Sequence, residues 1–589
     1  MIVFRIRDIA IIAIVSIIFI IILLTNGGAY KGENFDYVSF SVASGFYDDA
    51  FELELSAPVG WDIYYTVDSS DPSDESMKYD GAIHINDATQ NPNQYCLIDD
   101  VSLGYHQSEV ADIVGNVPNT EWYTIPDYNV DKCTVVRAVA VREEHYSDIY
   151  TQVYFVGFHN RNGYDGINVL SIVSDPTNLF DFERGIYVLG ETWADYKAKG
   201  EFKSDNWSWW LGNYSHRHRA YERPASIHYF DSNHNLNFTQ NVGIRIQGNS
   251  SRAYSPKNLN LYAREEYGNN KFPDIFGTGY YADTVNLFMG SQDYGTKIRD
   301  SLINDLVSSR DVSTRNYVPC VMFLDGEYWG LYYLTEKYDA EWIEYKYSVP
   351  AEDAVIFKNH ALEVGIDEDR QTYEAMMEFM STADMSVKEN YDKACRLVDI
   401  QSLADYYSIM LYIARYNDWP TGNMELWRMR LGNGPGYMDG KWRYMIFDLN
   451  SGSVDVSFLG EDSIQRVLDS DDVFHNMCRN KDFTALFMGA MIDLINTCFT
   501  YEAVNERVDY YKDILKEPMV INNNRFFGAD DYLVDSPFSY QADGFTYSEK
   551  VESVRTFLLE RRHYMIMFLE QHFGVNIETS DDGLYYIAG

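Results

Sequence analysis

Basic residues are scarce in this chain. Its 589 residues include 47 Lys and Arg against 89 Asp and Glu, which gives a formal net charge of −42. Such a charge repels phosphate backbones and anionic lipid headgroups, so it argues against nucleic acid and anionic membrane surfaces as partners. An acidic surface suits an extracellular protein, or one that receives basic substrate segments.

Closely spaced cysteines are also absent. The six cysteines form no C-x-x-C pair, which argues against a structural zinc site. Cys96 and Cys133 fall in the same small predicted domain and form the candidate disulfide pair. The other cysteines are expected to act as small buried apolar side chains.

Apolar and aromatic residues are abundant. The chain is 46% hydrophobic and 16% aromatic, with 49 tyrosines. This content is sufficient for large cores in several domains and excludes a disordered chain.

The N-terminus predicts export. Arg5 and Arg7 precede an uncharged run at 9–24, which would span about 24 Å as a helix. No clear A-x-A cleavage site follows, so residues 1–25 favour an uncleaved signal anchor over a signal peptide, with 26–36 as a polar linker. The positive-inside rule then places the rest on the extracellular side of the cell membrane, anchored or, if cleaved, secreted.

Residues 37–160 predict a small all-β sandwich with a long polar insertion at 86–132. Short alternating strands are expected at 51–55, 62–67, 82–85 and 134–141. The segments S-G-F-Y-D-D-A-F-E-L-E-L-S and V-V-R-A-V-A-V resemble the β-sandwich at the C-terminus of chitobiases and β-hexosaminidases. That resemblance implies an accessory module, either a spacer or a weak glycan contact.

Further strands and helices follow this module. Strands are expected at 169–173 and 185–189 and in a hairpin around the turn at 231–235. Helices are expected near the C-terminus, and the tail at 576–589 is expected to fray. The expected helices are 482–499, 502–516 and 547–573.

Two loop residues and one strand-end residue point to phosphoryl transfer. Asp418 and Asn423 stand five residues apart, and Asp448 ends an apolar strand further on. A predicted buried helix at 401–415 leads into this loop, and a strand pair at 424–431 and 441–449 follows it. Protein kinases use an Asp and an Asn at this spacing, plus a later Asp, for the base and the metal ligands. The alternative is that such residues only close turns or cap helices.

A second segment predicts an anion site. Residues 243–257 read G-I-R-I-Q-G-N-S-S-R-A-Y-S-P-K, a strand that ends in a turn of small residues. Small residues let backbone N–H groups approach an anion, and Arg252 and Lys257 could neutralise its charge. The alternative is an ordinary hairpin with surface cations.

The chain resembles the spore-coat protein H (CotH) kinase family over residues 165–500. The resemblance rests on the two segments just described and on K-I-R-D-S-L-I-N-D-L and F-L-D-G-E-Y-W-G-L-Y-Y-L-T-E-K-Y-D. The resemblance implies an α+β fold in which an atypical protein-kinase-like bilobal domain at 165–575 follows the sandwich and the N-terminal hydrophobic helix. It also implies ATP and Mg²⁺ or Mn²⁺ between a β-rich and a helical lobe.

The resemblance assigns roles to individual residues. It implies a helix at 296–309 that orients the lysine. The site residues are Asp418 as catalytic residue, Asn423 and Asp448 as metal ligands, Lys257 and Arg252 at the phosphates, and Glu336 at the nucleotide.

The chain departs from ordinary kinases, because it has no G-x-G-x-x-G, H-R-D, D-F-G or A-P-E motif. After Asp448 comes an acidic run, which favours a basic acceptor protein unless it is only a solvated loop. The run comprises Glu461, Asp462, Asp469, Asp471 and Asp472.

The expected function is transfer of the ATP γ-phosphoryl group to Ser or Thr of an exported or cell-surface protein of a bacterium. Three alternatives remain open. One is a non-catalytic surface protein that uses a kinase-like fold for binding. Another is a glycan-associated protein that uses the sandwich and Trp207, Trp209 and Trp210. The third is nucleotidyl transfer at the same metal site.

Overall fold

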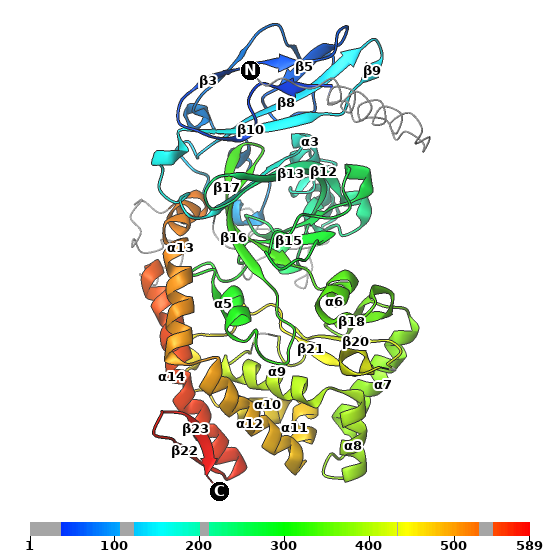
Figure 1. Ribbon diagram of the computed structural model, residues 1–589, viewed down its shortest axis with the longest axis vertical. Helices are drawn as coiled ribbons and strands as arrows, with labels where there is room; N and C mark the ends of the chain where they lie inside the picture. Colours follow the sequence, from blue (N-terminus) through cyan, green and yellow to red (C-terminus); the bar gives the residue numbers. More distant parts are fainter. Residues whose placement is uncertain are drawn as a thin grey trace, which may run out of the picture.

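A computed structural model describes residues 37–106, 123–200, 211–416, 418–432, 434–528 and 546–588. The predicted signal segment, the linker and the three tryptophans at 207, 209 and 210 lie outside these residues. The α+β prediction is confirmed: a small β-module lies at one end, a β-barrel lies in the middle, and a helical part lies at the other end (Figure 1).

The N-terminal module contains the predicted strands. Its main sheet has the order β2-β10-β8-β5-β6 with β9 on β8, and two strand pairs, β1-β4 and β3-β7, complete it. Val136, Ala138 and Ala140 of β8 point into its own small core. Val135 and Phe155 instead belong to the large core shared with the barrel. The strands are β1 (Ser39–Phe40), β2 (Gly45–Tyr47), β3 (Phe51–Leu53), β4 (Leu55–Ser56), β5 (Asp62–Thr66), β6 (Met77–Lys78), β7 (Ile83–Ile85), β8 (Thr134–Arg142), β9 (His145–Tyr146) and β10 (Tyr150–Val156).

Seven strands form a closed barrel in the order β11-β12-β13-β14-β15-β17-β16, which a parallel pairing of β11 with β16 closes. The predicted strand at 169–173 and the hairpin are confirmed as β11 and β12–β13. Every residue of β17 is buried, so β17 is a central strand of the core. The strands are β11 (Asn168–Val173), β12 (Arg223–Phe230), β13 (Leu236–Ile246), β14 (Leu259–Tyr262), β15 (Thr284–Phe288), β16 (Tyr317–Leu324) and β17 (Glu327–Glu336).

The prediction of a strand at 185–189 is wrong. The backbone N–H groups of Ile186 and Tyr187 donate to the carbonyls of Asn178 and Leu179, within a compact turn after α3 (Pro176–Phe180). The apolar side chains of this segment are buried in the large core. Its hydrophobic run therefore reflects a buried loop rather than a sheet strand.

The helical part carries a four-stranded sheet, β19-β18-β20-β21, on the side that faces the barrel (Figure 1). The predicted strand pair around the turn near residue 435 is confirmed as β20 and β21, which are antiparallel. The strands are β18 (Ala354–Lys358), β19 (Ala361–Val364), β20 (Glu425–Met429) and β21 (Arg443–Met445).

The helices agree well with expectation, except that α13 extends eleven residues beyond its predicted end at 516 and includes Pro518. The predicted bounds of α14 are confirmed, and a capping box of Thr546 and Glu549 fixes its start. The helices that follow α3 are α4 (Gly190–Lys199), α5 (Arg299–Leu306), α6 (Ala340–Tyr347), α7 (Glu368–Thr382), α8 (Lys388–Leu397), α9 (Ile400–Tyr412), α10 (Ser463–Ser470), α11 (Asp472–Cys478), α12 (Lys481–Thr497), α13 (Tyr501–Phe527) and α14 (Tyr547–Phe573).

The C-terminal tail is ordered, contrary to the prediction that it frays. It forms a hairpin of β22 (Asn576–Thr579) and β23 (Tyr585–Ala588). Asn496 of α12 fixes this hairpin, because its side chain exchanges two hydrogen bonds with the backbone of Tyr585, at 2.8 and 3.0 Å.

The predicted disulfide between Cys96 and Cys133 is wrong. All six cysteines fall within the described residues, and all are free thiols. Cys96 and Cys133 are 1% and 4% exposed and pack in the large core, where they serve as small apolar side chains.

Helix α13 links the three parts of the molecule (Figure 1). Asn522 accepts a hydrogen bond from the backbone N–H of Leu331 in β17, at 3.1 Å. The carbonyl of Phe526 accepts from Thr124 of the insertion, and Glu517 accepts from Gly163, which precedes the barrel. The helix therefore connects the helical part with the barrel and the N-terminal module.

Among the described helices, none is by itself long and apolar enough to cross a bilayer. Helices α12 and α13, which meet at a bend of 59°, pass that test only as a pair.

Candidate active site

The three residues predicted for phosphoryl transfer share an unusual backbone conformation. Asp418, Asn423 and Asp448 have φ values of +54°, +48° and +60°. Few residues other than glycine adopt this left-handed region, and such residues cluster at functional sites. All three positions, chosen from side-chain chemistry alone, are therefore among the fourteen described non-glycine residues with positive φ, a conformation that Asp and Asn tolerate better than most.

Two of these residues emerge at the same end of the β20–β21 ladder. The last paired residues there are Glu425 and Met445. Asn423 lies two residues before Glu425, and Asp448 lies three residues after Met445. Because the strands are antiparallel, Asn423 and Asp448 both lie in loops at the same end of the two strands.

Backbone hydrogen bonds hold the Asp418 loop against the segment that follows Asp448. The N–H of Tyr416 donates to the carbonyl of Gly452, and the N–H of Val454 donates to the carbonyl of Ile413, both at 2.9 Å. The two loops are therefore adjacent.

Helix α9 and a buried tryptophan anchor the Asp418 loop. Trp419 is 3% exposed, and its indole N–H donates to the Tyr406 hydroxyl of α9 at 3.0 Å. Asp418 itself is exposed. An anchored neighbour and an exposed carboxylate are what a residue that meets a bound substrate requires.

Asp448 has two further partners. Its Oδ1 accepts a hydrogen bond from the Asn450 amide at 3.0 Å, and its Oδ2 lies 3.8 Å from Nη2 of Arg415. The Asp448 side chain is 41% exposed, whereas that of Arg415 has no exposure. None of the three guanidinium nitrogens of Arg415 has a hydrogen-bond partner among the described residues.

Asp300, near the start of α5, holds the same segment from the barrel side. Its two carboxylate oxygens accept from the N–H of Leu449 at 2.8 Å and from the Asn450 amide at 3.0 Å. Burial and the negative charge of Asp448 raise the pKa of Asp300. These contacts join α5 to the strand-end loop that carries Asp448.

The sequence prediction missed the roles of Asp300, Arg415 and Asn450. Asp300 and Asn450 lie in motifs that carried the family resemblance, K-I-R-D and F-D-L-N, and Arg415 stands three residues before Asp418. An acid next to a helix start was the available signal for Asp300. The sequence gave no signal that the three residues meet, because hydrogen bonds between distant segments bring them together.

The prediction that the helix at 296–309 orients Lys257 is corrected in part. The helix exists as α5, but Asp300 binds the Asp448–Asn450 segment. Within the described part of the chain, no carboxylate forms an ion pair with Lys257.

Lys257 is fully buried at the end of the barrel. Its ammonium donates to the carbonyls of Arg252 and Tyr254 at 2.6 and 3.0 Å and lies 4.0 Å from the ring centre of Tyr214. Burial and the charge of Arg252 lower the pKa of Lys257 well below the ordinary value of lysine. A phosphate would have to displace these carbonyl contacts, and the phosphate role of Lys257 stays a prediction.

Arg252 is engaged in the same way. It is 6% exposed, and its guanidinium donates to the carbonyls of Gly248, Tyr214 and His216, at 2.7 to 3.1 Å. Its contacts shape the turn between β13 and β14. Its predicted contact with phosphate likewise stays a prediction.

The loop that carries Arg252 and Lys257 reaches the Asp448 segment through one residue. The N–H of Gln292 donates to the Asn450 side chain at 3.3 Å, and its amide donates to the Tyr254 hydroxyl at 3.4 Å. Gln292 therefore connects the predicted phosphate loop with the predicted metal loop.

Glu336 ends β17, where the chain leaves the barrel for α6. It is 1% exposed, and its carboxylate accepts from the backbone and the side-chain amide of Asn316, both at 3.0 Å. Both oxygens are thus used within the protein. The predicted contact of Glu336 with the nucleotide stays a prediction.

The donor chemistry at the ladder end suits a hard divalent cation. Asp448 offers a carboxylate and Asn423 an amide oxygen, and oxygen donors are what Mg²⁺ and Mn²⁺ prefer. If a metal binds at this site, these two residues are the ones that would hold it.

The acidic run after Asp448 is largely used for folding. Asp462 caps α10 and pairs with His572, and Asp471 caps α11 and accepts from the Tyr407 hydroxyl. Glu461 pairs with Arg466. These contacts explain most of the run without a basic partner, and the preference for basic acceptors stays a prediction.

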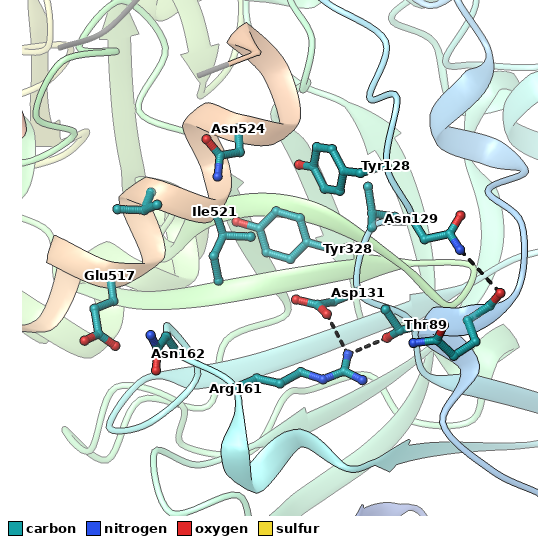
Figure 2. Close-up of a pocket in the computed structure, with 13 residues that line it drawn as sticks. Thr89, Tyr128, Asn129, Asp131, Arg161, Asn162, Tyr328, Glu517, Ile521 and Asn524 are labelled. Carbon is teal, nitrogen blue, oxygen red and sulfur yellow. Dashed lines mark hydrogen bonds and ion pairs between the residues drawn. The ribbon is translucent and has the colours of Figure 1, made fainter. Parts of the chain in front are cut away.

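A separate cavity of about 480 Å³ lies where the insertion, the barrel and α13 meet (Figure 2). Tyr128, Tyr328 and Asn524 line it, together with an ion pair of Arg161 and Asp131 at 2.6 Å. None of the six predicted site residues contributes to its wall. The cavity is therefore distinct from the candidate active site.

Two family models match the chain. The model described as Fn3 associated matches residues 51–154, in the N-terminal module. The likeness of that module to the chitobiase sandwich stays a prediction. No curated protein matches the chain. The model described as CotH kinase protein matches residues 244–565, more than half of the chain and all six predicted site residues. The chain therefore belongs to the CotH kinase family.

Proposed function

We propose that this protein transfers the γ-phosphoryl group of ATP to a Ser or Thr hydroxyl of an exported or cell-surface protein. One observation carries the proposal: Asp418, Asn423 and Asp448 all adopt left-handed backbone conformations, on loops that hydrogen bonds hold together. Membership in the CotH kinase family supports a kinase-like activity.

Asp418 is the catalytic residue of this proposal. Its exposed carboxylate accepts the hydrogen bond of the incoming hydroxyl, orients it and takes its proton as the new P–O bond forms and the bond between the γ-phosphorus and the oxygen that leaves with ADP breaks. The buried Trp419 and helix α9 keep the loop in place during that step.

Asn423 and Asp448 would hold Mg²⁺ or Mn²⁺, which neutralises charge on the phosphates when it is bound. Asp300 and Arg415 act as positioning residues. Asp300 fixes the backbone after Asp448, and Arg415 provides a positive charge behind its carboxylate.

The acceptor and the location rest on sequence features. The apolar run at 9–24 after two arginines supports an extracellular location, anchored or secreted. The net charge of −42 supports an acceptor protein with basic segments and disfavours nucleic acid.

The second candidate function is binding without catalysis, on the cell surface. The buried states of Lys257 and Arg252 favour it, because no preformed cationic phosphate site results from them. A glycan is one ligand class for such a protein, and the cavity in Figure 2 is one place for it.

An isotope experiment tests the proposal. The full-length chain is incubated with Mn²⁺, a degenerate Ser/Thr peptide library and ATP labelled at either the γ or the α phosphate. Wild type is compared with Asp418→Ala and Asp448→Ala. We expect γ label on the peptides with wild type and at least a hundredfold less with either variant.

Asp367→Ala is the matched control, because Asp367 is 91% exposed and lies outside the site. It should transfer γ label as wild type does. Transfer of α label would replace the proposal with nucleotidyl transfer. If the folded wild-type protein transfers neither label, the phosphoryl-transfer proposal is overturned in favour of binding without catalysis.

A further inference from the structure

A second group of carboxylates lies where the barrel joins α6. Asp283 stands directly before β15, and Asp339 and Glu341 stand at the start of α6. One carboxylate oxygen of each residue lies within 4.8 Å of those of the other two. Asp339 is 7% exposed, and Asp283 and Glu341 are half-buried, so three carboxylates meet at a partly buried point.

Ordinary helix capping explains only part of this cluster. Asp339 caps α6, because its carboxylate accepts the N–H of Trp342 at 3.0 Å, and Glu341 favours the positive helix start. Asp283 has no such explanation. It comes from a different segment, and its buried Oδ1 has no hydrogen-bond partner among the described residues.

A buried hydroxyl group interacts electrostatically with the same carboxylates. Tyr280 is 3% exposed, and its hydroxyl lacks a hydrogen-bond partner within the described ranges. Asp339 and Asp283 are its strongest electrostatic neighbours, followed by Glu336 and Glu341. Such a group, unpaired beside acceptors that could bind it, is expected where a ligand completes the site.

The protein compensates this charge only in part. The ammonium of Lys337 lies 3.5 Å from Oδ2 of Asp339, beyond a strong hydrogen bond, and the Lys337 side chain is 36% exposed. Burial and the acids Asp283 and Glu341 raise the pKa of Asp339 to about 6, against the opposing effect of Lys337. Among the described residues, Lys337 is therefore the one cation within ion-pair distance of these three acids.

We propose that Asp283, Asp339 and Glu341 bind a calcium ion, with the Tyr280 hydroxyl beside it. Calcium binds oxygen at about 2.3–2.6 Å, so oxygens on one ion lie up to about 5 Å apart, and the three carboxylate oxygens all lie within that range of one another. Magnesium usually keeps several waters and binds through one or two carboxylates, so a set of three carboxylates favours calcium. The site lies outside the proposed catalytic residues and does not depend on phosphoryl transfer.

The ion would join two parts of the molecule. Asp283 is attached to the barrel through β15, whereas Asp339 and Glu341 belong to α6 of the helical part. Bound calcium would therefore stabilise the connection between the barrel and the helical part. It would also reduce the repulsion that now opposes their contact.

Terbium luminescence tests the site, because a tyrosine beside bound Tb³⁺ sensitises its emission. The full-length chain is used with Asn423→Ala and Asp448→Ala, which remove the predicted catalytic metal site. We expect saturable emission that Ca²⁺ displaces more strongly than Mg²⁺ does. Asp339→Asn, which preserves the helix cap, should weaken binding at least tenfold, and Lys337→Met should strengthen it severalfold.

Two further measurements keep the test decisive. Asp283→Asn, which does not alter the α6 cap, should weaken Tb³⁺ binding as Asp339→Asn does, whereas Asp367→Asn should leave it unchanged. The parent chain is the full-length protein with Asn423→Ala and Asp448→Ala. Calcium at millimolar concentration should raise the unfolding temperature of this parent chain but not that of its Asp283→Asn variant. Equal Tb³⁺ affinity in the parent and both Asn variants, or no calcium effect on unfolding, would overturn the proposal.

Discussion

The guanidinium of Arg415 lies 3.8 Å from the carboxylate of Asp448 and is entirely buried. It has no hydrogen bond within the described residues, so its one charged partner is a side chain of the candidate metal site. A buried charge with so few partners is costly, which indicates that its position serves the site rather than stability.

The first prediction concerns Arg415→Met. We expect the apparent Mn²⁺ affinity and the rate of γ transfer to fall about tenfold or more, because Asp448 loses the charge that orients it. The unfolding temperature should stay the same or rise, since an apolar side chain replaces a poorly paired charge. A Mn²⁺ titration of transfer and a thermal unfolding curve check both parts.

Arg415→Lys serves as the comparison, since it keeps the charge and loses the planar group. It should retain more transfer than Arg415→Met. Loss of stability in Arg415→Met without a change in the Mn²⁺ titration would mean that Arg415 serves only the core.

The second prediction concerns Asp300→Asn. The variant keeps an acceptor for the Leu449 N–H but turns a donor toward the Asn450 amide, so one hydrogen bond is lost. We expect kcat to fall about tenfold, with a smaller change in the KM for ATP and a stability cost of about 1–3 kcal/mol. Steady-state kinetics with urea unfolding measures both.

Asp305→Asn is its control on the same helix. Asp305 pairs with Arg507 and accepts from Tyr511, so this change costs stability without contact to the Asp448 loop. If both variants lowered kcat equally, the effect of Asp300 would be one of stability alone.

The hairpin, α9 and α14 were predictable because their signals are local. Alternating apolar residues around the turn at 231–235 define β12 and β13, and Thr546 with Glu549 marks the start of α14. The spacing of Asp418 and Asn423 is equally local. These features depend little on distant parts of the chain.

The rest depended on contacts between distant segments. Lys257 resembles a surface cation in sequence, yet the barrel end buries it against carbonyls. The apolar run at 185–189 matches a strand by composition, but its N–H groups bond to residues 178 and 179. Asp300 meets Leu449 across 149 residues, and no pattern along the chain predicts that.

The third prediction concerns the pH dependence of stability. Lys297 is buried, and its Nζ donates hydrogen bonds to the carbonyls of Met289 and Leu331. Burial lowers the pKa of Lys297 to about 7, although the negative charge of Asp293 acts in the opposite direction. Unfolded lysine titrates at about 10.4, so between these values the unfolded chain binds more protons. Stability contributed by this group therefore rises with pH, by at most roughly 1.4 kcal/mol per pH unit.

Replacing Lys297 with Met should remove that rise. Urea unfolding at pH 7, 8 and 9 should show a flatter profile for Lys297→Met than for wild type. Lys346→Met, at an exposed position of α6, should keep the wild-type slope. Equal slopes in all three proteins would contradict the prediction.

The fourth prediction concerns the attachment of the insertion. Glu327 at the start of β17 is 3% exposed, and its two oxygens accept the N–H groups of Gln94 and Cys96 at 2.6 and 2.7 Å. Glu327→Gln turns an amide donor toward one of these N–H groups. We expect a loss of about 1–3 kcal/mol and faster proteolysis near residue 95.

Urea unfolding and limited proteolysis followed by mass spectrometry measure this change. Glu363→Gln on the exposed strand β19 is the control and should change neither. Unaltered cleavage in Glu327→Gln would show that other contacts attach the insertion.

Helix α13 has a consequence for how the site opens. On one flank the chain passes from β17 into α6, and on the other flank α13 runs from the helical part up to β17 and the insertion (Figure 1). A molecule fastened along both edges resists the clamshell motion by which two lobes swing apart about one hinge. In the proposed kinase reaction, a nucleotide would therefore enter and leave through small displacements of the loops around Gln292 and Asp448 rather than through lobe rotation.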